Sequence, residues 1–252
     1  MGTDFIIIGS GFGGSAAALR LAEKGYSVLV LEQGRRFAPS DFPESDWNLK
    51  KFLWAPRLGW HGILRCSFFR EVFVLSGTGV GGGSLVYANT LMKPGDEFFS
   101  NPSWKAGSGW KQKLEPHYET ARQMLGATPY PVSGNPEDQL LKELAVETGR
   151  ADTFSMVDTG VYYGDPEKET DPYFSGKGPL RKGCTGCAGC MTGCRENAKN
   201  SLDKNYLWLA AKLGVQIFAG TQAVKIEHRE GRYYVHTRKS GTGGFRGVLS
   251  SD

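Results

Sequence analysis

Hydrophobic and polar positions in the first 32 residues follow a strand, helix, strand order. Residues 4–8 form a short apolar run that is typical of a buried parallel strand. Residues 16–22 repeat apolar side chains at helical spacing, and Gly25 ends that helix. Residues 27–32 form a second apolar run. The pattern therefore predicts one complete β-α-β unit.

The pattern after residue 32 predicts an irregular segment, three helices and several short strands. Residues 35–75 are irregular and rich in aromatic side chains, which indicates a long functional loop. Helices are expected at about 110–125, 136–149 and 201–213, the last capped by Asn200 or Ser201, with a loop over 159–183. Short strands are expected at 215–218, in a hairpin of 223–228 and 232–238, and at 245–250.

Bulk charge and hydropathy narrow the class of protein. The 252 residues hold 30 Lys and Arg against 26 Asp and Glu, and a net charge of +4 with scattered basic residues argues against a nucleic-acid partner. No apolar run approaches the roughly 18 residues of a transmembrane segment. Met1 leads into a strand without a basic segment and cleavage site, so we expect no secretory signal and a cytoplasmic location.

The turn between the first strand and helix carries a dinucleotide-binding signature. Gly9 permits a tight turn, Gly11 lets the backbone approach a pyrophosphate, and Gly14 lets helix and strand pack closely. Glu32, 18 positions after Gly14, ends the next strand, where its carboxylate can accept hydrogen bonds from ribose hydroxyls. The alternative is a plain strand, turn and helix with incidental glycines.

Later elements favour FAD over NAD as the dinucleotide. A long aromatic segment and a second glycine-rich stretch, residues 77–84, separate the first β-α-β unit from the helix, strand and hairpin at 201–238. That order is typical of flavoproteins with an antiparallel β-meander. The predicted fold class is therefore α/β, a Rossmann-like FAD/NAD(P)-binding parallel sheet with a β-meander and the start of a substrate-binding lobe.

Four motifs together resemble those of the glucose–methanol–choline (GMC) oxidoreductases, most closely the bacterial cholesterol oxidase branch. The motifs are GSGFGGS (9–15) with LEQG (31–34), GTGVGGGSLVYAN (77–89), AKNSLDKNYL (198–207) and TQAVKIEH (221–228). The resemblance implies that FAD is bound by residues 1–34, 77–92 and 198–252, under a lid or loop at 35–76. It also implies that residues 93–197 belong to a substrate lobe.

The resemblance also assigns cofactor contacts to individual residues. It implies that Phe12, Gly13 and Gly14 line the pyrophosphate and that Glu32 holds the adenosine ribose. The flavin is expected against Gly81, Gly82, Gly83 and Ser84, and adenine against the backbone of Val224. Tyr87 stands where cholesterol oxidases have Asn, and Asn89 follows two places on, so either side chain is a candidate contact of the isoalloxazine.

Four cysteines lie within eleven residues and form a candidate metal site. Cys184, Cys187, Cys190 and Cys194 have the spacing of a ferredoxin cluster run, although Arg195 stands where proline usually follows. Some sugar dehydrogenases of the GMC family hold an iron–sulfur cluster with similar spacing. The alternatives are a structural zinc site and thiols that are simply buried or paired. Cys66 is interpreted as a lone core cysteine, with a remote metal ligand as the alternative.

The resemblance implies FAD-dependent oxidation of an alcohol, with hydride transfer to the flavin and oxygen or a redox protein as electron acceptor. The expected substrate is a sterol or another apolar alcohol. One alternative is a sugar or polyol dehydrogenase that passes electrons through an iron–sulfur cluster, and another is a non-catalytic nucleotide-binding module. No catalytic residue is assigned, because GMC enzymes carry their base in a C-terminal part that residues 1–252 do not match. We therefore expect an N-terminal fragment.

The four histidines are interpreted as solvent-facing or loop residues: His61, His117, His228 and His236.

Overall fold

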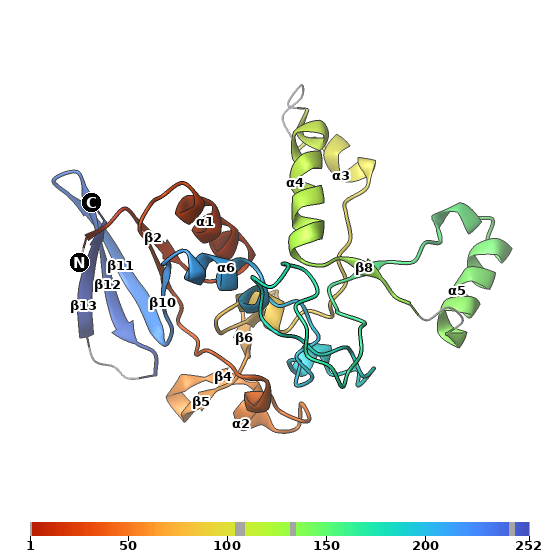
Figure 1. Ribbon diagram of the computed structural model, residues 1–252, viewed down its shortest axis with the longest axis horizontal. Helices are drawn as coiled ribbons and strands as arrows, with labels where there is room; N and C mark the ends of the chain where they lie inside the picture. Colours follow the sequence, from red (N-terminus) through yellow and green to blue (C-terminus); the bar gives the residue numbers. More distant parts are fainter. Residues whose placement is uncertain (1, 104–108, 132–134, 242–244, 252) are drawn as a thin grey trace.

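The fold is seen in a computed structural model that describes residues 2–103, 109–131, 135–241 and 245–251. Both termini lie beside a small β-sheet at one end of the molecule, and helix α5 stands on an arm at the other end (Figure 1). The elements expected to bind a dinucleotide lie between these two ends, around helix α1.

A three-stranded parallel sheet forms the centre of the nucleotide-binding part. Its order is β10 (Gln216–Phe218), β3 (Val28–Leu31) and β2 (Phe5–Ile8). Helices α1 (Phe12–Glu23) and α6 (Tyr206–Lys212) pack on one face through Val28 and Val30 of β3. The alternate residues Leu29 and Leu31 contact Val235 on the other face. The predicted Rossmann-like β-α-β unit is thereby confirmed.

The edge position of β2 differs from the fully buried strand that its apolar run predicts. Phe5 and Ile8 are 38% and 50% exposed, because β2 pairs only with β3 among the described residues. Strand β3, which has a partner on each side, is buried at every position.

The predicted hairpin and third strand form the antiparallel meander. Strands β11 (Thr221–Arg229), β12 (Arg232–Lys239) and β13 (Phe245–Ser251) follow one another across the sheet. The two-residue strand β1 (Gly2–Thr3) joins β13 in parallel, which the sequence pattern did not predict. This sheet therefore ties the two ends of the chain together.

The helix predicted at 201–213 begins later than its polar start indicates. A 3-10 turn occupies Leu202–Lys204, and α6 begins at Tyr206. Asn205, and not Asn200 or Ser201, caps α6, since its side-chain oxygen accepts the Tyr206 N–H. Asn200 is instead buried and bonded to Arg181.

The segment predicted as an irregular loop contains regular structure. A hairpin of β6 (Leu64–Phe68) and β7 (Phe73–Gly77) leads into the second glycine-rich stretch. Before it come α2 (Leu49–Phe52) and the short pair β4 (Trp54–Ala55) and β5 (Trp60–His61). The hairpin was missed because its consecutive apolar residues, such as Phe73, Val74 and Leu75, are exposed and show no alternation.

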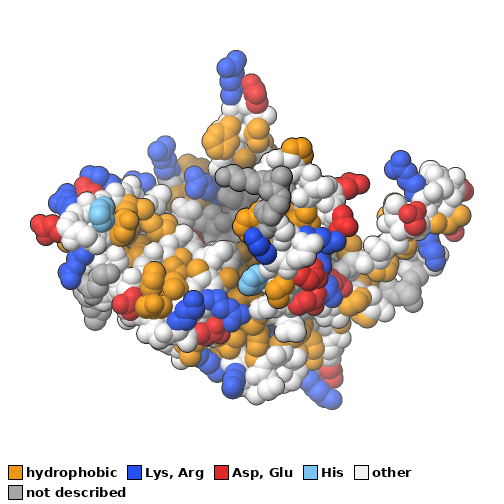
Figure 2. All heavy atoms as spheres, turned by 90° about the horizontal axis from the view of Figure 1, so that it is seen from above, with side chains coloured by type: hydrophobic (Ala, Val, Ile, Leu, Met, Phe, Trp, Pro, Cys, Tyr) orange, Lys and Arg blue, Asp and Glu red, His pale blue; other side chains and the backbone are white. Residues whose placement is uncertain are grey.

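The middle of the chain is mostly loop with separate helices. The two predicted helices are confirmed as α4 (Trp110–Met124) and α5 (Pro136–Glu147), and a short α3 (Asp96–Ser100) precedes them. Strands β8 (Thr128–Pro129) and β9 (Asp158–Thr159) pair at the base of the α5 arm. On the face seen in Figure 2, acidic and basic side chains are interspersed and hydrophobic ones lie between them. Within the described ranges, no helix is long and apolar enough to cross a bilayer.

Candidate functional site: two glycine-rich loops in contact

The first glycine loop, residues 9–14, leaves the start of α1 open to a ligand. Gly9 has a φ of +93°, which favours glycine, and Gly11 caps α1 without a side-chain hydrogen bond. A Cβ added at Gly11 or Gly13 meets no atom within 4 Å, whereas one at Gly14 lies 2.0 Å from the Gly9 carbonyl oxygen. The helix start therefore presents N–H groups and open space, which suits a phosphate.

Ser10 links the first glycine loop to Glu32. Its N–H and Oγ donate to Glu32 Oε2 at 3.1 and 2.7 Å, and the Gly34 N–H donates to Oε1 at 2.8 Å. An ionised carboxylate has about four acceptor positions, so one remains on Oε1 after these three bonds. Glu32 is buried directly after β3, and its role in holding a ribose stays a prediction.

The second glycine segment, residues 77–89, packs directly on the first glycine loop. Ser10 Oγ accepts the Gly81 N–H at 3.1 Å, and a Cβ on Gly82 would lie 2.8 Å from Gly11 Cα. A Cβ on Gly34 would lie 2.2 Å from Gly79 N. The two motifs that the sequence places some seventy residues apart thus form one site, with backbone against backbone.

The second glycine segment contains a tight turn made by glycine. Gly81 and Gly82 have φ of +110° and +53°, so both need a conformation that other residues rarely adopt. Gly83 lies beside the ring of Phe12. Ser84 is buried, its Oγ donating to the Gly81 carbonyl at 2.7 Å and accepting the Leu202 N–H at 2.9 Å. The Ser84 hydroxyl therefore already holds the turn in place.

Val224 lies at an irregularity of β11. The pairing of β11 with β12 shifts register between Ala223 and Lys225, so Val224 is left out of the ladder. The strand itself starts beside Glu32, since the Thr221 N–H donates to the Glu32 carbonyl at 2.8 Å. Among the described residues Val224 has no directly opposite residue on β12, and its contact with adenine stays a prediction.

These features together fit a dinucleotide. Donors at the α1 start face open space, and a buried carboxylate keeps an acceptor position. A hollow of about 250 Å³ opens beside Phe12 and is lined by Leu91, Met92, Tyr118 and Arg122. Arg122 forms an ion pair with Asp158 there.

Tyr87 lies in the second glycine segment with a buried hydroxyl. Its ring contacts Phe12 edge-on at 6.0 Å between centroids, and its Oη has no hydrogen-bond partner among the described residues. Burial raises the pKa of Tyr87 above its ordinary value. A Cβ on Gly160 would lie 2.4 Å from this hydroxyl. Tyr87 and Gly160 are therefore matched in size.

Replacing Gly160 by alanine is expected to destabilise the fold by about 1–3 kcal/mol, because the new methyl group overlaps the Tyr87 hydroxyl. Adding Tyr87→Phe removes that oxygen and is expected to restore most of the loss. Tyr87→Phe alone breaks no described hydrogen bond, so it serves as the control. Urea denaturation of the four proteins measures this, and an equal loss in the single and double Gly160→Ala variants would contradict it.

The cysteine loop, residues 184–194, lies against the second glycine segment. Cys190 Sγ accepts a hydrogen bond from Asn89 Nδ2 at 3.0 Å. Cys194 Sγ accepts the N–H groups of Ala198 and Lys199 at 3.3 and 3.4 Å. Burial raises the pKa of the Cys184 and Cys190 thiols. All five cysteines of the chain are free.

The metal site predicted at Cys184, Cys187, Cys190 and Cys194 stays a prediction. Among the described residues, no group of three or more Cys, His, Asp or Glu side chains is gathered closely enough to hold a metal ion. Cys187 is exposed, while the other three are partly buried. Hydrogen bonds to the sulfurs tune an iron–sulfur cluster, and N–H donors to Cys190 and Cys194 are present.

Two buried cations hold this region together, and sequence reasoning did not single them out. Lys199 Nζ donates to the carbonyls of Leu85 and Cys190 at 3.1 and 2.7 Å, and burial lowers its pKa to about 8. Arg181 donates to the Lys199 carbonyl and to Asn200 Oδ1 at 2.8 and 2.9 Å. Lys199 lies in the run AKNS and Arg181 in a loop, and nothing local to either position indicates burial, which depends on distant partners.

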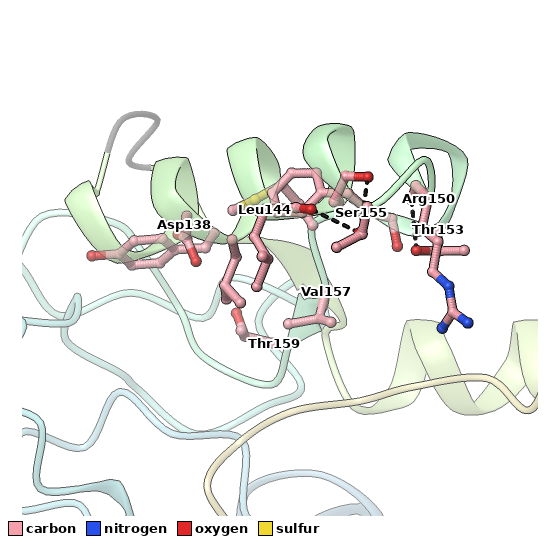
Figure 3. A pocket seen from close by; sticks show the side chains of 13 residues that line it. Asp138, Leu144, Arg150, Thr153, Ser155, Val157 and Thr159 are labelled. Carbon is pink, nitrogen blue, oxygen red and sulfur yellow. Dashed lines mark hydrogen bonds between the residues drawn. The ribbon is translucent and has the colours of Figure 1, made fainter.

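A second hollow lies away from this site, along the α5 arm. It has a volume of about 600 Å³ and is lined mainly by apolar side chains such as Leu144 and Val157, with Arg150 at one end (Figure 3). Figure 1 places α5 far from α1, so this groove is not part of the nucleotide site.

The fold defines an α/β protein with a Rossmann-like β-α-β unit, and a model of the NAD(P)-binding Rossmann-like domain matches residues 7–50. A cholesterol oxidase of Mycobacterium tuberculosis is 48% identical over 95% of this chain, and one of Acinetobacter baumannii is 43% identical over 91%. GMC-type oxidoreductases also match. The chain is therefore similar in sequence to cholesterol oxidases and to GMC-type oxidoreductases, as the motifs predicted.

A solved structure shares the fold at low sequence identity. Pyridoxine 4-oxidase from Mesorbium loti aligns with 99% of this chain and 48% of its own, with a TM-score of 0.57 and 15% identity. The chain likewise spans about 42% of the length of each of the two cholesterol oxidases. The similarity therefore concerns that share of the longer proteins.

Proposed function

We propose that this chain binds FAD and belongs to an oxidoreductase that oxidises an alcohol. The observation that carries the proposal is the contact between the two glycine-rich loops, which places Ser10 between Glu32 and Gly81. Homology to cholesterol oxidases supports FAD and the alcohol. We further propose residues 1–34, 77–92 and 198–252 as the FAD-binding part, and 93–197 as part of a substrate lobe.

Each group at the site has a proposed task. N–H groups at the start of α1 would bind the pyrophosphate, with Gly11 and Gly13 allowing close approach. Glu32 would accept a ribose hydroxyl, and the Val224 backbone would bind adenine. The second glycine segment would orient the isoalloxazine ring. When bound, FAD supplies the acceptor for the hydride that leaves the alcohol carbon.

The proposed substrate is a sterol or another apolar alcohol, because the relatives that are 48% and 43% identical are named cholesterol oxidase. Oxygen is the proposed electron acceptor on the same ground. The cysteine loop favours a second candidate, a dehydrogenase of a sugar or polyol that passes electrons through an iron–sulfur cluster. It is supported by the sulfur-directed hydrogen bonds at Cys190 and Cys194.

Adding FAD to the purified protein tests the proposal. We expect one FAD to bind per chain, with quenched flavin fluorescence and protection from thermal unfolding, and NAD in the same assay serves as the control. Anaerobic addition of a sterol or a polyol to the protein of the full reading frame, which would include the expected C-terminal part, then distinguishes the two candidates by which alcohol bleaches the flavin absorbance. A protein that stays colourless with FAD would overturn the proposal.

A further inference from the structure

The cysteine loop is joined to the second glycine segment at two places. One is the bond of Asn89 Nδ2 to Cys190 Sγ at 3.0 Å. The other is the Lys199 ammonium, which bridges the Leu85 and Cys190 carbonyls at 3.1 and 2.7 Å. Both therefore hold Cys190 against the stretch that is proposed to face the flavin.

Contacts continue from Cys190 to the first glycine loop. Lys199 Nζ lies 4.5 Å from the centroid of the Tyr87 ring, as a cation over an aromatic face. The Tyr87 ring in turn contacts the ring of Phe12, with 6.0 Å between the two centroids. Packed residues thus connect the cysteine loop with the start of α1.

Asn89 itself has an unusual backbone. Its φ is +59°, a left-handed conformation that few residues other than glycine adopt. Two bonds hold it: the Asn89 carbonyl accepts the Gly160 N–H at 2.7 Å, and the side chain donates to Cys190. Losing the side-chain bond would leave Asn89 tied to Gly160 but no longer to the cysteine loop.

We propose that Asn89 is a positioning residue that acts through Cys190 to hold the second glycine segment in the FAD-binding conformation. The inference rests on the proposed function, since it concerns FAD affinity. In this proposal the side-chain amide of Asn89 binds the cysteine loop and not the flavin. The cysteine loop then contributes to the affinity for FAD.

A double-mutant cycle on FAD affinity tests the inference. Asn89→Gly removes the side chain and suits a φ of +59°, and Cys190→Ala removes the sulfur. We expect each to raise the Kd for FAD about fivefold and the pair to raise it no further, because both break the same bond. Fluorescence titration of the purified proteins with FAD measures the four values.

A matched cycle separates this bond from loss of a metal ligand. Cys187 belongs to the same cysteine run but is exposed. The effects of Asn89→Gly and Cys187→Ala are therefore expected to multiply. The inference is overturned if Asn89→Gly is coupled equally to Cys190→Ala and to Cys187→Ala. It is also overturned if the changes in the Kd for FAD multiply in both pairs. Absence of FAD binding in the unmodified protein overturns the proposed function as well, so the two failures are distinct.

Amide hydrogen exchange tests the inference on the unmodified protein, so it does not depend on whether the variants fold. In the unmodified protein, saturation with FAD is expected to slow amide hydrogen exchange at Ala198 and Lys199, which donate to Cys194 Sγ. Exchange in α5, on its separate arm, is the internal control. Protection confined to the glycine loops, with 184–199 unchanged, overturns the inference.

Discussion

Replacing Gly14 by alanine is expected to abolish FAD binding and to destabilise the fold by at least about 3 kcal/mol. The new Cβ would lie 2.0 Å from the Gly9 carbonyl oxygen and 3.2 Å from Ile7 Cγ2. The first of these atoms belongs to the backbone of the turn itself, which cannot move without opening the first glycine loop. Helix α1 would have to shift away from β2, and the donors at its start would leave the phosphate position.

Gly13→Ala provides the matched control, one residue away in the same turn. A Cβ at Gly13 meets no atom within 4 Å, and alanine favours a helix by about 1 kcal/mol over glycine. This variant should therefore unfold at the same urea concentration as the unmodified protein or a higher one. Equal stability of the Gly14→Ala and Gly13→Ala proteins would contradict the predicted close packing.

Glu32→Gln is expected to destabilise the protein without ligand by about 1–3 kcal/mol and to weaken FAD binding about thirtyfold. Three donors converge on this buried carboxylate: Ser10 N–H, Ser10 Oγ–H and Gly34 N–H. Glutamine keeps the size but has a single acceptor oxygen, so its NH₂ group would face one of these donors. The acceptor position that remains for a ribose hydroxyl is lost in the same step.

Glu23→Gln is the control for charge alone, because Glu23 forms an exposed ion pair with Arg20 on α1. Exposed pairs of this kind contribute at most about 1 kcal/mol, so little change is expected. Urea denaturation without FAD and fluorescence titration with FAD measure the two effects separately. FAD affinity equal to that of the unmodified protein in Glu32→Gln would remove Glu32 from the ribose site.

The β-α-β unit could be predicted because its determinants are local. Gly9, Gly11 and Gly14 act within a few residues of their own backbone, and the apolar runs around them have a clear period. The role of Ser10 could not be predicted, since it depends on Glu32 and Gly81 arriving from elsewhere in the chain.

Other differences have the same physical origin. The cap of α6 was predicted at Asn200 or Ser201, but it is Asn205. A 3-10 turn occupies the positions directly after Ser201, and the bond from Leu202 N–H to Ser84 Oγ holds this turn in place. The burial of Lys199 likewise depends on Leu85, which is 114 residues away in the sequence. Local pattern indicates which residues are polar, but not which distant carbonyls they reach.

The contact of Gly82 with Gly11 also has a consequence for folding kinetics. These residues can meet only after the chain between them has closed a long loop, which costs roughly 4 kcal/mol of entropy before any packing offsets it. The contact between the first glycine loop and the second glycine segment should consequently form late during refolding, after the hairpin of β11 and β12. Ligand capture would then follow, and not guide, the collapse of the amino-terminal half.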